Sequence, residues 1–299
     1  MQSRRDFLSA TAAGAAGFLA APALPMEPIK RTGKPTIKFS LAAYSLRDHL
    51  TAKKGEKPRL DLPGFIDYCA AQGLDGTELT AYYFPPSPTP AYLNEIKRRC
   101  QFAGLDISGG AIGNNFCLPP GAKLDEEFKK TAGWVRTYAA LGVRVIRVFA
   151  GNVPKGEPES EYVGRCIENL EKACEEAGKH GVILALENHG GITAKADRML
   201  EIVRGVKSPW FGVNFDSGNF RAEDPYAELA KIAPYAVNAQ LKVDMHKPKG
   251  GDYPADFGKV AAILKDAGYS GWVALEYEAK EPPYDGIPKG LAKMRAAFA

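Results

Sequence analysis

Three carboxylates at the ends of short apolar runs are the residues best suited to chemistry in this chain. Glu187 ends the run 182–187, Asp216 ends the run 211–216, and Glu276 lies near the end of the run 272–277. If these side chains converge, they repel one another unless a cation neutralises them. Their type and placement predict a divalent metal site. The alternative is that each acid pairs with a neighbouring Lys or Arg at the edge of a loop.

Two further groups accompany the acids, because side chains alternate along a strand and residues two apart share a face. His189 shares the face of Glu187, and Lys242 shares a face with Gln240 in the run 237–242. His189 is a candidate for orienting a substrate or moving a proton. Lys242 could polarise a carbonyl or hydroxyl group, or pair with a carboxylate. Each run would then provide one metal ligand and one group that contacts a substrate.

Eight strand-like runs alternate with amphipathic helical stretches and would bring these groups together. Gly-containing helix ends precede several of the runs, and Asp224-Pro225 marks the start of one helix. Eight such units in about 276 residues match an α/β fold, a single (β/α)8 TIM barrel over 37–299, whose active site lies at the carboxyl ends of the strands. The predicted strands are 37–42, 76–79, 105–108, 143–149, 182–187, 211–216, 237–242 and 272–277.

The segments 185–188, 214–219 and 273–277 resemble the xylose isomerase-like TIM-barrel superfamily, the sugar phosphate isomerase/epimerase group. The resemblance covers roughly 37–298. It implies a small-molecule carbohydrate as substrate, and it is compatible with a homo-oligomer.

The resemblance also implies a metal-ligand set of Glu187, Asp216 and Glu276. The family usually places a His, followed two residues later by Lys, on the seventh strand, whereas this chain has Gln240 and Lys242. An amide oxygen from Gln240 would complete an all-oxygen set, which favours one Mn or Mg ion, with Co or Zn as further options. The same substitution could instead mark the loss of the metal.

The activity implied by the resemblance is a metal-dependent isomerisation or epimerisation. The ion would act as Lewis acid while Glu187 and Glu276 remove and return a proton. We expect a non-phosphorylated sugar, because the chain contains neither Gly-x-Gly-x-x-Gly nor a Walker pattern.

Five residues are predicted to bind the substrate or line the barrel. Asn219 stands where many relatives carry a His, and His246 and Tyr44 lie near strand ends. Glu78 and Arg147 fall within or at the end of earlier strands, where an unpaired charge is costly, so we expect an ion pair between them.

Two alternative functions remain open, and a third is disfavoured. A lyase that cleaves 3-keto-glycosides would use the same site to expel a leaving group. A degenerate barrel that binds carbohydrate without turnover would explain Gln240 and Asn219. An AP endonuclease-like nuclease is disfavoured, because its metal site needs several His ligands and this chain has only 4 His.

Composition narrows the partners and the compartment. A formal net charge of +4 gives no basis for nucleic-acid binding, and no run beyond the leader is long and apolar enough to cross a membrane. The first 23 residues have the features of a twin-arginine signal peptide, namely Arg4-Arg5, an Ala/Gly-rich run and the cleavage triplet Ala21-Pro22-Ala23. We therefore expect a signal peptide over 1–23, a linker over 24–36 and export of the protein to the periplasm. The 5 Cys form no C-x-x-C pair and are expected to be free core thiols.

Overall fold

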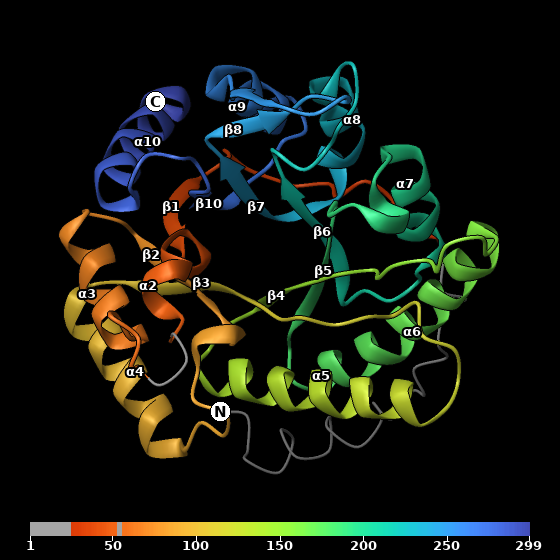
Figure 1. Cartoon of the computed structure of the whole chain (residues 1–299), viewed down its shortest axis with the longest axis horizontal. Helices are drawn as coiled ribbons and strands as arrows, with labels where there is room; N and C mark the ends of the chain where they lie inside the picture. The colour runs from red at the N-terminus through yellow and green to blue at the C-terminus, as the bar shows by residue number, and fades with distance from the viewer. Residues whose placement is uncertain (1–24, 53–55) are drawn as a thin grey trace, which may run out of the picture.

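Eight parallel strands close into a barrel in a computed structural model that describes residues 25–52 and 56–299 (Figure 1). Neighbouring strands in the barrel follow the order β1-β10-β7-β6-β5-β4-β3-β2. The predicted (β/α)8 fold is therefore confirmed. The barrel strands are β1 (Ile37–Ala42), β2 (Gly76–Thr80), β3 (Asp106–Ala111), β4 (Val145–Val148), β5 (Ile183–Glu187), β6 (Phe211–Asp216), β7 (Ala236–Lys242) and β10 (Gly271–Glu276).

The helices form a ring outside the barrel, as Figure 1 shows. The apolar side chains between the two layers form the main core. The α-helices are α2 (Arg47–Leu50), α3 (Leu62–Ala71), α4 (Pro90–Ala103), α5 (Ala122–Ala140), α6 (Glu159–Lys179), α7 (Ala196–Gly205), α8 (Pro225–Ile232), α9 (Phe257–Asp266) and α10 (Pro283–Phe298). Short 3-10 turns follow or precede strands: η1 (Ala43–Leu46), η2 (Ala81–Tyr83), η3 (Gly191–Thr193) and η4 (Ala233–Tyr235).

Several helix starts follow directly from the local sequence. The carboxylate of Asp224 accepts a hydrogen bond from the amide of Ala227, and Pro225 occupies the first turn of α8. An N-cap of this kind satisfies one of the amides that a helix leaves unpaired at its start. The predicted start at Asp224-Pro225 is confirmed, and Asp61 and Asp256 cap α3 and α9 in the same way.

A small hairpin follows β7, outside the eight predicted strands. β8 (Asp244–His246) pairs antiparallel with β9 (Asp252–Pro254). The Lys-rich stretch between them is the turn, with Gly250 and Gly251 both at positive φ. Strands of three residues carry no readable alternation in sequence, and the turn residues alone do not show that the flanking chain pairs.

The segment from residue 25 to β1 runs along the amino end of the barrel. The backbone amide of Ile29 donates to the carbonyl of Pro234, and the guanidinium of Arg31 donates to the carbonyl of Ala236 at 2.5 Å. The predicted signal peptide, 1–23, lies outside the described residues. No helix within the described ranges is long and apolar enough to cross a membrane. All five cysteines are free and buried, as expected.

Candidate active site

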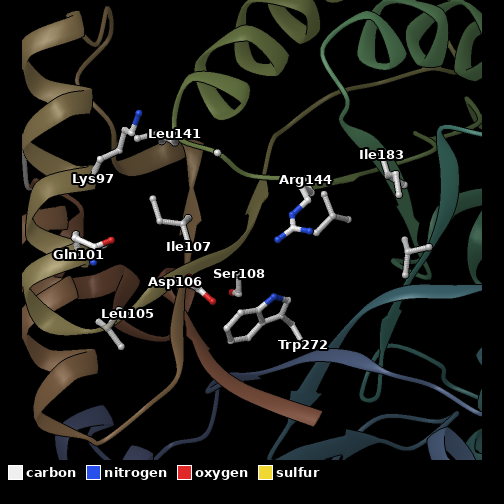
Figure 2. A pocket seen from close by; sticks show the side chains of 14 residues that line it. Lys97, Gln101, Leu105, Asp106, Ile107, Ser108, Leu141, Arg144, Ile183 and Trp272 are labelled. Atoms are coloured by element: carbon white, nitrogen blue, oxygen red, sulfur yellow. The ribbon is translucent and has the colours of Figure 1, made fainter. Parts of the chain in front are cut away.

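A cavity of about 770 Å³ opens at the carboxyl ends of the barrel strands. This end carries the active site in (β/α)8 barrels. A second hollow of about 430 Å³ lies near the opposite, amino end of the strands and is drawn in Figure 2, where Asp106, Arg144 and Trp272 surround it. The predicted chemistry is found at the carboxyl end. The residues that line the larger cavity are Tyr44, Tyr82, Arg147, Phe149, Glu187, His189, Gly190, Asn219, Arg221, Lys242, His246, Glu276 and Glu278.

Glu187, Asp216 and Glu276 converge at the base of this cavity. One carboxylate oxygen from each lies within 4.8 Å of the others. The residues are only 2%, 0% and 5% exposed, so little water screens their charges. The acidic triad expected from the sequence is therefore present as a spatial cluster, although β5, β6 and β10 provide its three members from distant parts of the chain.

The side chain of Lys242 points into the same cluster from β7. Its Nζ lies 2.7 Å from Oε2 of Glu276 and 3.3 Å from Oδ2 of Asp216, and it also donates to Glu278. Parallel register places Lys242 beside Glu276. Of the two roles predicted for Lys242, the structure shows the pairing with a carboxylate.

Arg147, on β4, brings a second positive charge to the three carboxylates. Its Nε lies 2.9 Å from Oε2 of Glu187, its Nη1 donates to the carbonyl of Ile112, and its guanidinium stacks over the ring of Phe149 at 4.0 Å. The predicted ion pair between Glu78 and Arg147 is wrong. Register on β5 puts Arg147 opposite Ala185, from where it reaches Glu187 one layer higher on the same face.

Glu78 instead crosses the barrel interior to β7. Its carboxylate accepts hydrogen bonds from Gln240 at 2.5 Å and from Asn238 at 3.1 Å. Its neighbour on β3 in the strand register is Gly109. The predicted role of Glu78 in contacting substrate does not match this position, because Glu78 is fully buried below the cavity.

Gln240 belongs to the same interior layer. Its Oε1, the atom predicted to bind a metal, accepts a hydrogen bond from Asn214 at 2.7 Å, and its Nε2 is held by Glu78. The side chain is thus held by the interior network and does not join the triad. The prediction of Gln240 as a fourth ligand finds no support in this geometry, because its acceptor atom is already bonded.

Asn219 and His189 lie at the rim of the cavity. The amide of Asn219 donates to Oε1 of Glu187 at 3.0 Å, so it orients that carboxylate. The ring of His189 packs against Phe149 with centroids 4.5 Å apart. Both residues line the cavity, and Asn219 also holds Glu187 of the triad.

Tyr44 and His246 also line the cavity, as do two residues that the sequence did not single out for the site. Nδ1 of His246 lies 2.8 Å from Asp252 across the hairpin. Tyr82 follows β2, and Arg221 follows β6 within the loop that carries Asn219. Position after a barrel strand was the available signal for both.

Burial and neighbouring charges shift the pKa values of the site in opposite directions. Burial raises the pKa of Asp216 well above its ordinary value, even though Lys242 opposes the shift. Burial would also raise the pKa of Glu276, but Lys242, Arg147 and a hydrogen bond with Asp216 together lower that pKa. Burial alone would lower the pKa of Arg147, but Glu187, Tyr82 and Glu276 together raise it above its ordinary value. The three carboxylates of the triad carry more negative charge than Lys242 and Arg147 neutralise. A proton on one carboxylate, or a cation bound between them, would reduce this excess.

The triad fits a divalent cation. Oδ2 of Asp216 and Oε2 of Glu187 are buried and accept no hydrogen bond of good geometry from the described part of the chain. Carboxylate oxygens are the ligands that hard divalent ions prefer. Glu187, Asp216 and Glu276 would hold such an ion.

The Xylose isomerase-like TIM barrel family matches residues 66–297. The chain belongs to this family. That membership confirms the resemblance inferred from the strand-end motifs.

Curated relatives of this family member include isomerases. It is 24% identical over 254 residues to a 2-oxo-tetronate isomerase of Cupriavidus necator, covering 77% of this chain and 92% of that protein. It is also 24% identical over 310 residues to the rhizopine catabolism protein MocC of Rhizobium meliloti, covering 89% of each.

Solved structures show the same fold. The D-psicose 3-epimerase of Clostridium cellulolyticum H10 superposes with a TM-score of 0.71 at 15% identity, covering 87% of this chain and 99% of that one. The IolI protein with a bound zinc atom gives a TM-score of 0.66 at 18% identity over 87% and 96%.

Proposed function

We propose that this family member is a divalent-metal-dependent isomerase or epimerase of a non-phosphorylated sugar. The observation that carries the proposal is the buried triad of Glu187, Asp216 and Glu276 at the base of a 770 Å³ cavity. Relatives named 2-oxo-tetronate isomerase, hydroxypyruvate isomerase and L-ribulose-5-phosphate 3-epimerase support the reaction class.

A divalent ion at the triad would supply a Lewis acid that polarises a carbonyl group. Mn or Mg suits the oxygen ligands best, and the zinc atom in the IolI structure keeps Zn open. Glu187 and Glu276 are the acid–base pair, since epimerisation needs one group to remove a proton and another to return it.

The remaining residues position this pair and the substrate. Arg147 and Asn219 fix the two carboxylate oxygens of Glu187, and Lys242 donates a hydrogen bond to Oε2 of Glu276 in the structure. His189 and Tyr44 face the cavity, where they can contact hydroxyl groups of a sugar.

A 3-keto-glycoside lyase is the second candidate, and one observation favours it. A side pocket of about 200 Å³ adjoins the main cavity and shares Phe149, His189 and Gly190 with it. A leaving group attached to the sugar would have a place there. Only this reaction releases an aglycone, so product analysis separates it from epimerisation.

We further propose export through the twin-arginine route, on the pattern in residues 1–23, and a homo-oligomeric state. N-terminal sequencing of the secreted protein tests the first, with a new terminus near Leu24 expected. Light scattering on the purified protein tests the second.

The decisive experiment follows incorporation of deuterium from D₂O into a panel of ketoses and 3-keto-glycosides in the presence of Mn²⁺. Glu187→Gln and Glu276→Gln should each slow exchange by about 10²- to 10⁴-fold, the usual contribution of a general acid or base. Glu175→Gln, at an exposed position on α6, is the matched control. Sugar binding without exchange in the wild-type protein would instead support the carbohydrate-binding barrel.

A further inference from the structure

We propose that the ammonium group of Lys242 competes with the divalent ion for the triad, and that Glu278 receives this ammonium when the metal enters. The inference rests on the proposed metal site. It concerns how the chain admits an ion to that site.

Lys242 touches the same atoms that would bind the metal. Its Nζ lies 2.7 Å from Oε2 of Glu276 and 3.3 Å from Oδ2 of Asp216. A divalent ion binds carboxylate oxygens at about 2.1 Å, so it would lie next to this ammonium. The two cations repel each other, and the buried setting screens them little. One of them must therefore leave the triad.

Strand β7 offers no ligand that would favour the metal. Gln240, the residue one layer below Lys242, has both polar atoms of its side chain bonded to Asn214 and Glu78. The strand thus presents a cation to the triad. Lys242 itself is 6% exposed and is paired with the carboxylates of Glu276 and Glu278.

Glu278 provides the second position for the ammonium. It lies two residues beyond Glu276 on the same side of the chain, its side chain is 36% exposed at the cavity mouth, and it already accepts a hydrogen bond from Nζ of Lys242. A small rotation of the flexible lysine stem would break the contacts with Asp216 and Glu276 and keep the contact with Glu278.

Gly218 lets the loop after β6 pack closely against the lysine stem. A Cβ at this position would meet Cδ of Lys242 at 2.7 Å and its Cβ at 2.8 Å. The backbone of the loop after β6 therefore packs directly on the lysine stem without a side chain between them.

Calorimetric titration with Mn²⁺ tests the proposal without an activity assay. Lys242→Met should bind Mn²⁺ about tenfold more tightly than wild type, and Glu278→Gln about tenfold more weakly, within the usual range for coupling between two sites. Lys249→Met removes an exposed lysine from the hairpin turn and should bind as wild type does.

The double variant Lys242→Met/Glu278→Gln separates the role of Glu278 from simple loss of negative charge. If Glu278 acts by holding Lys242, Glu278→Gln should have little effect once the lysine is absent. An equal loss of affinity in both backgrounds would overturn the proposed role of Glu278. Thermal unfolding of each metal-free variant checks that the fold is intact, and Lys242→Gln provides a second variant if Lys242→Met unfolds.

Equal or weaker Mn²⁺ binding by a folded Lys242→Met would overturn the competition. Binding by Lys242→Met but not by wild type would support it strongly. If neither protein binds Mn²⁺, both the competition and the metal dependence fail. Absence of deuterium exchange in a wild-type protein that binds Mn²⁺ would overturn only the proposed reaction.

Discussion

Nε of Arg147 lies 2.9 Å from Oε2 of Glu187, and this buried ion pair joins β4 to β5 beneath the cavity. Both side chains are almost fully buried, at 6% and 3% exposure. The same guanidinium stacks on Phe149 and donates to the carbonyl of Ile112. Arg147 thus holds the proposed acid–base residue Glu187 in place and links β4 to the segment after β3 through the carbonyl of Ile112.

Replacement of Arg147 by Gln should lower the free energy of unfolding by about 3–5 kcal/mol, because it leaves the carboxylate of Glu187 buried without its partner. Urea denaturation measures the change. Arg144→Gln, at an exposed position just before β4, is the control and should change stability by less than about 0.5 kcal/mol. A folded Arg147→Gln protein as stable as this control would contradict the assigned pairing.

Glu78 should make stability depend on pH. Burial raises its pKa from 4.5 to about 7, helped by the charge of Glu276. The folded protein therefore holds this proton over a pH range in which the unfolded chain has released it, so the contribution of Glu78 to stability falls as pH rises from 4.5 to 7. The loss should be on the order of 3 kcal/mol across this window.

The measurement compares unfolding free energies of wild type and Glu78→Gln at intervals from about pH 4.5 to about pH 8. The difference between the two curves isolates Glu78 from the other titrating groups. It should change steadily up to about pH 7 and then level off. A difference that stays constant with pH would show that Glu78 does not titrate in this window.

Asn219→Ala should weaken Mn²⁺ binding or slow exchange by about 10- to 100-fold, the usual cost of removing a group that orients a metal ligand. The amide of Asn219 is the donor to Oε1 of Glu187. Calorimetry and deuterium exchange give the two values. An Asn219→Ala protein that binds Mn²⁺ and exchanges deuterium as wild type does would contradict the role of Asn219 in orienting Glu187.

Gly110→Ala should destabilise the protein by at least about 2 kcal/mol through overpacking. A Cβ at Gly110 would lie 2.4 Å from the ring of Tyr138, whose hydroxyl donates to the carbonyl of Leu79 at 2.6 Å. The effect should shrink in a Tyr138→Leu background, and a double-mutant cycle by urea denaturation measures the coupling. Additive losses would mean that the strain lies elsewhere.

The sequence by itself determined the eight strands, their alternation with helices and the three acids of the triad. Each of these rests on local information. Apolar runs and Gly-containing helix ends mark the strands. Because all barrel strands are parallel, residues at their carboxyl ends must meet at one end of the barrel. Glu187, Asp216 and Glu276 could therefore be placed together without knowing any contact.

Only the tertiary structure decided which cation meets which acid. The register between strands sets how high each side chain stands in the barrel, and no local pattern encodes it. Register brings Arg147 to Glu187 and Lys242 to Glu276, while Glu78 crosses the barrel to Gln240. The predicted ion pair between Glu78 and Arg147 was wrong for this reason. A residue's place on a strand is readable from the sequence, whereas its partner across the barrel depends on the closure of the whole sheet.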